Sequence, residues 1–115
     1  MIGGKNLVPM LVSGVGIWNA FRGQNPGGVM LNGVCLADAD LARADLRGAF
    51  LLGSDLKGAN LEFSFLQAAD LRGADLSTAQ GLTSGQLLET LGDSNTRLPE
   101  DLPRPAWWSR NGKGA

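Results

Sequence analysis

Residues 44–48 of the chain read Ala-Asp-Leu-Arg-Gly, and residues 69–73 repeat the same five letters. They are two copies of a unit that fills residues 29–78, with a small or compact residue two places before each leucine. Asp or Asn precedes the leucine in six repeats, and Gly often follows two places after it. Leucine itself recurs at every fifth position without a gap, at Leu31, Leu36, Leu41, Leu46, Leu51, Leu56, Leu61, Leu66, Leu71 and Leu76.

A spacing of five residues fits no regular helix or strand. On an α-helix that turns by about 100° per residue, successive leucines would lie about 140° apart. On a flat strand, they would alternate between the two faces. The leucines can share one interior only if the backbone turns a corner once per repeat. Because Gly, Asp and Asn suit tight turns, the pattern predicts a solenoid with a leucine core.

The unit Ala-Asp-Leu-x-Gly resembles the signature of the pentapeptide-repeat family, and the resemblance covers about residues 29–78. It implies an all-β solenoid, a right-handed quadrilateral β-helix with about four repeats to a coil. Residue n would then stack on the residue about twenty places later. These repeats would make about 2.5 coils and a rod about 12 Å long, given the spacing of stacked strands.

Both flanks of the repeats are interpreted as caps on a single domain, 1–115. Residues 1–28 form the N-terminal cap segment, in which Met10, Ile17, Trp18 and Phe21 recur at helical spacing. Gly23 and Pro26 are placed to end this helix. A cap is expected here because a short solenoid would otherwise expose leucines and strand edges at its ends.

Residues 79–115 are predicted to form a C-terminal capping helix and an extended tail. Thr83-Ser84-Gly85-Gln86 has the form of a capping box, and Gly92 is placed to end the helix. The stretch 96–108 resembles a tail frequent in bacterial members of the family. Its prolines favour an extended path over the solenoid wall.

The sequence offers no catalytic, cofactor-binding or metal-binding residues, and an enzyme is not expected. The chain has no His or Tyr, and its one cysteine, Cys35, has no histidine to activate it. No Cys/His cluster suits zinc, and no glycine-rich loop suits phosphate. The regularly spaced aspartates are explained by repetition. We therefore expect no cofactor.

Outward-facing apolar residues are the candidate partner surface. Stacking by twenty places puts Met30, Phe50 and Leu52 on one face, and Phe63 and Phe65 at a corner and on the neighbouring face. Contiguous exposed apolar residues tend to mark binding sites. The sequence leaves open whether the C-terminal tail covers them instead.

The fold and the missing catalytic groups favour a non-enzymatic protein–protein interaction or scaffold module with an unknown protein partner. Pairing of the chain with its own copy, as a homodimer, is left open. The alternative is a DNA-mimicking binder of a type II topoisomerase such as gyrase, as some members of the family are. Residues 29–78 hold seven acidic and four basic residues, for a net charge of −3. That field is weak for a mimic of B-DNA, which carries one charge per about 1.7 Å.

Neither nucleic acid nor a membrane is an expected partner, and a cytoplasmic location is expected. The whole chain has a net charge of −1, so no strong field attracts an anionic polymer or surface. The uncharged run 7–21 is too short and too polar to span a bilayer. Nothing after it resembles a small-x-small cleavage site, so a cap helix is favoured, and an export signal is the alternative for this run.

Overall fold

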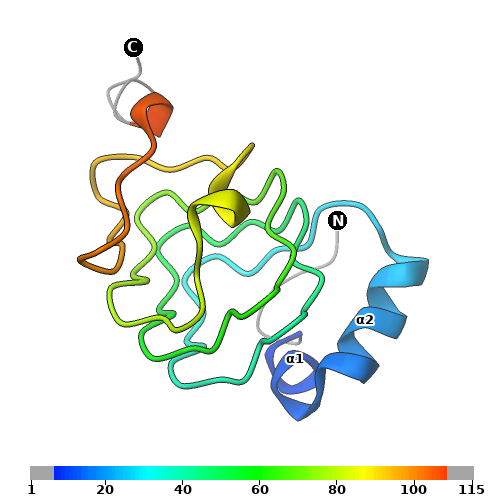
Figure 1. The fold of residues 1–115 in the computed structure, drawn as a ribbon. Helices are drawn as coiled ribbons and strands as arrows, with labels where there is room; N and C mark the ends of the chain where they lie inside the picture. The colour runs from blue at the N-terminus through cyan, green and yellow to red at the C-terminus, as the bar shows by residue number, and fades with distance from the viewer. Residues whose placement is uncertain (1–6, 109–115) are drawn as a thin grey trace.

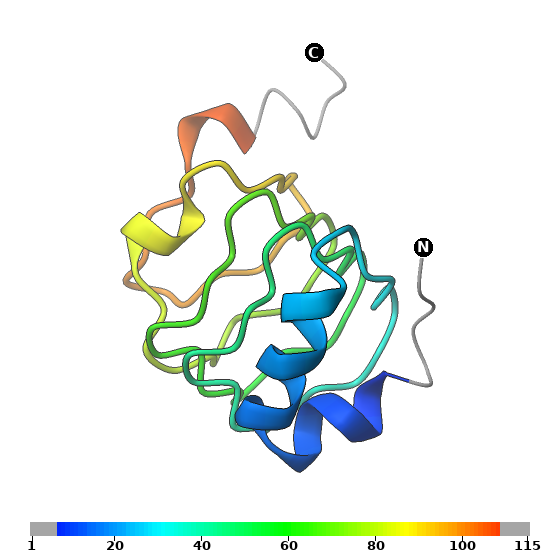
Figure 2. The same ribbon diagram turned by 90° about the vertical axis from the view of Figure 1, so that its right-hand side faces the viewer.

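The structure is a computed structural model, and it describes residues 7–108 of the chain. The outer parts of the two predicted cap segments, residues 1–6 and 109–115, lie outside the described residues. Within that range the named helical elements are α1 (Val8–Ser13), α2 (Val15–Gln24) and the 3-10 turn η1 (Ser84–Leu87), and residues 106–108 are helical as well. Between α2 and η1 the repeats wind as stacked coils, drawn cyan to yellow in Figures 1 and 2.

The repeat region is a β-helix solenoid. Its coils are joined by parallel backbone bridges between residues twenty places apart, such as Met30 with Phe50, Cys35 with Asp55 and Asp45 with Phe65. Each contact is an isolated bridge, so no extended strand forms in residues 7–108. This differs from the expectation of stacked strands, because a corner every five residues leaves a single paired residue on each side.

The corners are made by residues with left-handed backbone conformation. The residue two places after each leucine has a positive φ at nine consecutive repeats, 33 to 73. Five of the nine are glycines, and the others are Asp38, Arg43, Phe63 and Ala68, with φ between 58° and 65°. The left-handed conformation costs a residue with a Cβ about 1–2 kcal/mol, whereas glycine adopts it freely.

The ten leucines of the repeat fill the interior, and each is at most 1% exposed. Alanine or serine lines the walls two places before most of them; Ala44, Ala49 and Ala59 are fully buried. Backbone hydrogen bonds of 2.7–2.9 Å join the N–H of nine of the ten leucines to the coil above, as from Leu36 to the Asp55 carbonyl at 2.8 Å. Burial and hydrogen bonding thus act together at the same residue.

Helices α1 and α2 lie against one end of the coils (Figure 2). Leu11 and Trp18 are fully buried and belong to the same apolar cluster as the repeat leucines. The chain bends between the helices at Gly14, whose φ of 156° favours glycine. Among residues 7–108, no helix has the length and apolar character needed to cross a membrane.

One detail of the expected N-terminal helix is wrong. Ile17 does not face the coils and is 59% exposed, because α1 and α2 are separate helices that meet the solenoid with different faces. The helix ends at Gln24, between the two predicted stop residues Gly23 and Pro26. It ends where the Asn25 side chain donates a hydrogen bond to the Phe21 carbonyl at 2.9 Å.

Side chains of α2 form hydrogen bonds with backbone groups of the first coil. These groups have no earlier coil to pair with. The Trp18 indole donates to the Asp45 carbonyl at 2.9 Å, and the Asn19 Oδ1 accepts from the Asp45 N–H at 2.9 Å. The guanidinium of Arg22 donates to the Asp45, Asn25, Gly27 and Arg47 carbonyls. Burial lowers the pKa of Arg22 below its usual value. These side chains supply the bonds that a preceding coil would have made.

The predicted C-terminal helix is wrong in length. The capping box forms, with Gln86 N–H donating to the Thr83 hydroxyl and the Thr83 N–H donating to the Gln86 side chain. It begins only the one turn η1, and Leu88 already has an extended backbone. Gly92 therefore does not end a helix.

Beyond η1 the chain returns to the coils with a changed register. Leu91 bridges to Asp70, and Arg97 bridges to Asp75, offsets of 21 and 22 residues instead of 20. The Thr96 side chain is buried and donates to the Leu71 carbonyl at 2.8 Å. Another helical turn, 106–108, follows the prolines that were expected to keep the tail extended.

Gly92 is buried beneath the ring of Trp108. A Cβ at Gly92 would lie 2.3–2.5 Å from three ring carbons of Trp108, closer than real contacts allow. Trp108 is itself fully buried. The glycine is thus required by a close approach at the C-terminal end, and not by its backbone conformation.

We predict that Leu56→Ala destabilises the chain by about 2–5 kcal/mol, because it leaves a cavity in the middle of the leucine stack. Leu88→Ala, at a leucine that is 58% exposed, is the control and should change the free energy of unfolding by less than about 0.5 kcal/mol. Urea unfolding followed by circular dichroism measures both. Equal effects would contradict the leucine core.

Gly92→Ala should also be destabilising, by about 1–3 kcal/mol, because the added methyl group displaces the Trp108 ring. The control is Gly23→Ala in α2, where a Cβ would meet nothing within 4 Å. Alanine favours a helix over glycine, so this variant should be as stable as the native chain or more stable. Tryptophan fluorescence should report the displaced ring in Gly92→Ala alone.

Candidate functional site

Two phenylalanine side chains project from the second coil into solvent. Phe63 is 61% exposed and Phe65 is 47% exposed; together they are called the aromatic patch below. The C-terminal segment, which could have covered these side chains, pairs with Asp70 and Asp75 on the next coil. Large apolar side chains at this exposure are the strongest candidate contact surface on the repeat walls.

Phe63 occupies a corner position where five other repeats carry glycine. Its φ of 58° is unusual for a bulky residue. Arg43 is the equivalent corner residue one coil earlier, so the two side chains leave the wall in parallel. The guanidinium carbon of Arg43 lies 5.0 Å from the centre of the Phe63 ring, a cation–π contact.

Phe65 lies on the neighbouring wall, stacked on Asp45. A small hollow of about 200 Å³ separates it from α2 and is lined by Asn19, Asp45, Arg47 and Phe65. The Arg47 guanidinium and the Asp45 carboxylate form two hydrogen bonds of 2.8 Å. The charges around Phe65 are therefore already paired.

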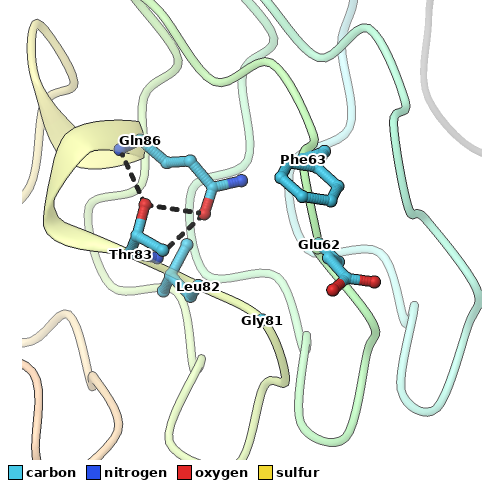
Figure 3. Close-up of a pocket in the computed structure, with 6 residues that line it drawn as sticks. All are labelled: Glu62, Phe63, Gly81, Leu82, Thr83 and Gln86. Atoms are coloured by element: carbon cyan, nitrogen blue, oxygen red, sulfur yellow. Dashed lines mark hydrogen bonds between the residues drawn. The ribbon is translucent and has the colours of Figure 1, made fainter.

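A larger hollow lies on the other side of Phe63 (Figure 3). It has a volume of about 350 Å³ and is open to solvent; its walls are Glu62, Phe63, Gly81, Leu82, Thr83 and Gln86. The last four belong to the segment that leaves the coil at Gly81, which has a φ of 76°. The hollow thus forms between the second coil and the departing chain.

The other predicted surface residues lie elsewhere and are less exposed. Met30, Phe50 and Leu52 are half-buried. Met30 and Phe50 bridge to each other, and Phe50 bridges on to Asp70. The Asn32 side chain accepts from the Leu52 N–H at 2.9 Å and reaches the Met30 sulfur at 3.2 Å. This face is held together by its own contacts, and the structure does not join it to the aromatic patch.

The repeated aspartates serve the corners. In six repeats the Asp or Asn side chain accepts a hydrogen bond from the N–H two residues later, at 3.0–3.2 Å; the acceptors are Asp40, Asp45, Asp55, Asn60, Asp70 and Asp75. This is the Asx turn that Asp and Asn favour. Asp55 and Asp75 do stack, but each is used in its own turn. Their spacing is structural.

Two of these carboxyl groups have pKa values below their usual range. The hydrogen bond from the Arg47 side chain lowers the pKa of Asp45 and outweighs the effect of burial. Burial raises the pKa of Asp75, but hydrogen bonds from Ser77 and the charges of Lys57 and Arg97 outweigh it. Both groups are therefore ionised over the physiological range.

No group of three or more potential metal ligands occurs among residues 7–108. Cys35 is an exposed free thiol, as its outward repeat position predicts. The repeat pattern was not used to predict that Arg43, Leu82 and Gln86 lie beside Phe63. The twenty-residue stacking could have paired Arg43 with Phe63. It could not have placed Leu82 and Gln86, because they lie where the chain leaves the repeat register.

Comparison with known proteins points to one family. A family model described as pentapeptide repeats matches residues 35–73 in eight copies. The crystal structure of a pentapeptide repeat protein from the cyanobacterium Cyanothece 51142 is similar, with 36% identity over 61% of this chain and a TM-score of 0.52. The match covers 47% of that protein, so the chain spans about half of its length.

A pentapeptide repeat protein from Nostoc Pcc 7120 is 27% identical over 89% of this chain and 90% of its own, with a TM-score of 0.33. No curated protein matches the chain.

The stability of the chain should fall on acidification below about pH 4. Because the pKa values of Asp45 and Asp75 are lowered on folding, their contribution is complete above the unfolded pKa of about 3.9 and is lost as the pH falls through the folded values. Urea unfolding at several pH values measures this. Asp45→Asn should flatten the dependence, whereas Asp101→Asn in the exposed tail should not. An unchanged slope in Asp45→Asn would contradict the assignment.

Proposed function

We propose that this chain, which belongs to the pentapeptide-repeat family, is a non-enzymatic module that binds another protein through its aromatic patch. The observation that carries the proposal is the exposure of Phe63 and Phe65, at 61% and 47%, on adjoining parts of one coil. Aromatic side chains are enriched at protein interfaces because each buries a large area at low entropic cost.

The conformation of Phe63 supports the same proposal. A left-handed backbone costs a bulky residue free energy that glycine would save. Five of the nine repeats from 33 to 73 have glycine at this corner, so the fold does not need phenylalanine there. The ring is also largely solvent-exposed, so burial within this chain does not offset the cost. A partner that covers the ring would.

The solenoid provides a stiff support for the patch. We infer a right-handed, four-sided winding of about 2.5 coils, with helices α1 and α2 as the N-terminal cap and residues 79–108 as the C-terminal cap. The bonds from Trp18, Asn19 and Arg22 to the first coil support the first assignment. The bridges of Leu91 and Arg97 to the last coil support the second. Both ends are then closed, and the walls are left for recognition.

The proposal that the module is non-enzymatic rests on the use of its polar groups. The aspartates that could act as acids or bases accept backbone hydrogen bonds in the corners. The hollow beside Phe63 is shallow and has one carboxylate, that of Glu62, on its wall. A general acid or base must lie within hydrogen-bond reach of the proton it transfers in a bound substrate, and a shallow hollow gives little to hold a substrate in that position.

DNA mimicry is not favoured. Of the seven acidic residues in 29–78, Asp45 and Asp70 form ion pairs with Arg47 and Arg72 at 2.8 and 2.6 Å. Asp55 lies 4.0 Å from the Lys57 ammonium. The remaining field is weak, and a strong negative field is what such a mimic requires.

The binding proposal is tested by affinity capture from a lysate of the source organism. We predict that a specific protein is retained by the native chain and lost from the double variant Phe63→Asn/Phe65→Ser. Asn is chosen at residue 63 because it tolerates the left-handed conformation. Removing two aromatic anchors should weaken binding at least about tenfold, since such residues dominate interface energies.

The matched control is Val12→Ser/Ile17→Ser, which removes two apolar side chains that are 51% and 59% exposed at the N-terminal end. Circular dichroism establishes that both double variants are folded. Retention of the partner by the control and its loss from the patch variant would support the proposal. Equal retention by the two variants, or no specific partner for the native chain, would contradict it.

A further inference from the structure

The hollow beside Phe63 combines apolar walls with one carboxylate, that of Glu62. Phe63 and Leu82 supply its apolar walls, and Thr83 and Gln86 supply its polar ones (Figure 3). Its volume of about 350 Å³ is at the lower end of the range for ligand sites, about 300–1,000 Å³. It is large enough for one long side chain and too small for a folded element.

The neutral polar groups of the hollow are already satisfied. The Gln86 Nε2 donates to the Leu61 and Ser64 carbonyls at 2.8 and 2.9 Å, and its Oε1 accepts from the Thr83 N–H at 2.8 Å. The Thr83 hydroxyl oxygen accepts from the Gln86 N–H at 3.4 Å. These groups hold the wall in shape and leave little capacity for a ligand.

Glu62 supplies the remaining polar group of the hollow, and its carboxylate, like those of Asp38, Asp40 and Asp75, makes no ion pair with any cation among residues 7–108. The carboxylates of Asp45, Asp55 and Asp70 each have a basic partner within 4.0 Å. The Glu62 side chain is exposed and lines the hollow. It is the one charged group on these walls. Charge complementarity therefore favours a cationic occupant.

We infer that this hollow receives a lysine or arginine side chain of the protein partner, which deepens and rests on the proposed function. The aliphatic stem lies between Phe63 and Leu82, as long basic side chains do on apolar surfaces. The charged end meets the Glu62 carboxylate and adds a charge-assisted hydrogen bond. The same partner segment covers the rest of the aromatic patch.

Arg43 provides a way to determine the charge of the bound group. Its guanidinium stacks on Phe63 at 5.0 Å from the ring centre, so it opposes a second cation near that ring. If the bound group is basic, neutralising Arg43 strengthens binding. If the bound group is acidic, it pairs with Arg43, and the same change weakens binding. The sign of one substitution thus distinguishes the two charges.

The test is a titration of the full, ¹⁵N-labelled chain with capped five-residue peptides of sequence Gly-Ala-X-Ala-Gly, where X is Lys, Arg or Glu. At millimolar concentration, the Lys and Arg peptides should shift the amide signals of Glu62, Phe63, Leu82 and Gln86, and the Glu peptide should not. Glu62→Gln should weaken binding about five- to tenfold. Arg43→Gln should strengthen it about twofold. The control variant Glu100→Gln, in the exposed tail, should bind like the native chain.

Unshifted signals with the basic peptides would overturn the inference, as would preferential binding of the Glu peptide or unchanged binding by Glu62→Gln. Affinity capture separates this failure from failure of the proposed function. A partner that is lost with Phe63→Asn/Phe65→Ser but retained fully by Glu62→Gln would support binding through the aromatic patch. It would contradict the inference that a basic side chain of the partner occupies the hollow.

Discussion

One turn of the backbone every five residues is the constraint on which the structure depends. It is set by a buried leucine, an Asx turn before the corner and a left-handed residue at the corner. If the corner were missed once, the following leucine would face solvent and the bridges to the next coil would lose register. Burial, hydrogen bonding and backbone conformation agree at most repeats, and such agreement is what specifies a single fold.

The constraint also divides the positions of the repeat into two groups, which tolerate different ranges of side chains. The leucine and the residue two places before it meet close neighbours and are restricted to a few side chains. The corner residue points outward and is restricted mainly by its φ, so several corners carry Asp38, Arg43, Phe63 or Ala68 at a modest cost in stability. The candidate site uses this freedom, because Arg43 and Phe63 are corners of adjacent coils.

The sequence predicted the repeat region well, because periodicity of five reports directly on turning and burial. Stacking by twenty residues gave the neighbours of Asp45, Asp55 and Met30. The flanks were predicted less well. The capping box at Thr83 was found, but the helix it begins ends at Leu87. Capping signals mark where a helix starts, whereas its length depends on tertiary contacts, here the return of the chain to the coils.

The candidate site was predicted only in part, because it combines residues of the repeat with residues of the C-terminal flank. Phe63 and Phe65 could be placed outward from the repeat alone. The hollow beside Phe63 could not, since four of its six wall residues come from the segment that departs at Gly81. No local pattern in that segment indicates how far it lies from the coil.

The hydrogen bonds from α2 to the first coil make the two ends of the stack different. In a stack where each layer touches only its neighbours, loosening spreads from an end inward and stops where the next layer holds. Release of Trp18 and Arg22 would uncover residues 43–47 while Phe63 and Phe65 stayed on a coil still held by the turns above it. Amide protons should therefore exchange fastest in the first coil and slowest around Leu56 and Leu61, a gradient along the axis in which the binding wall belongs to the slow part.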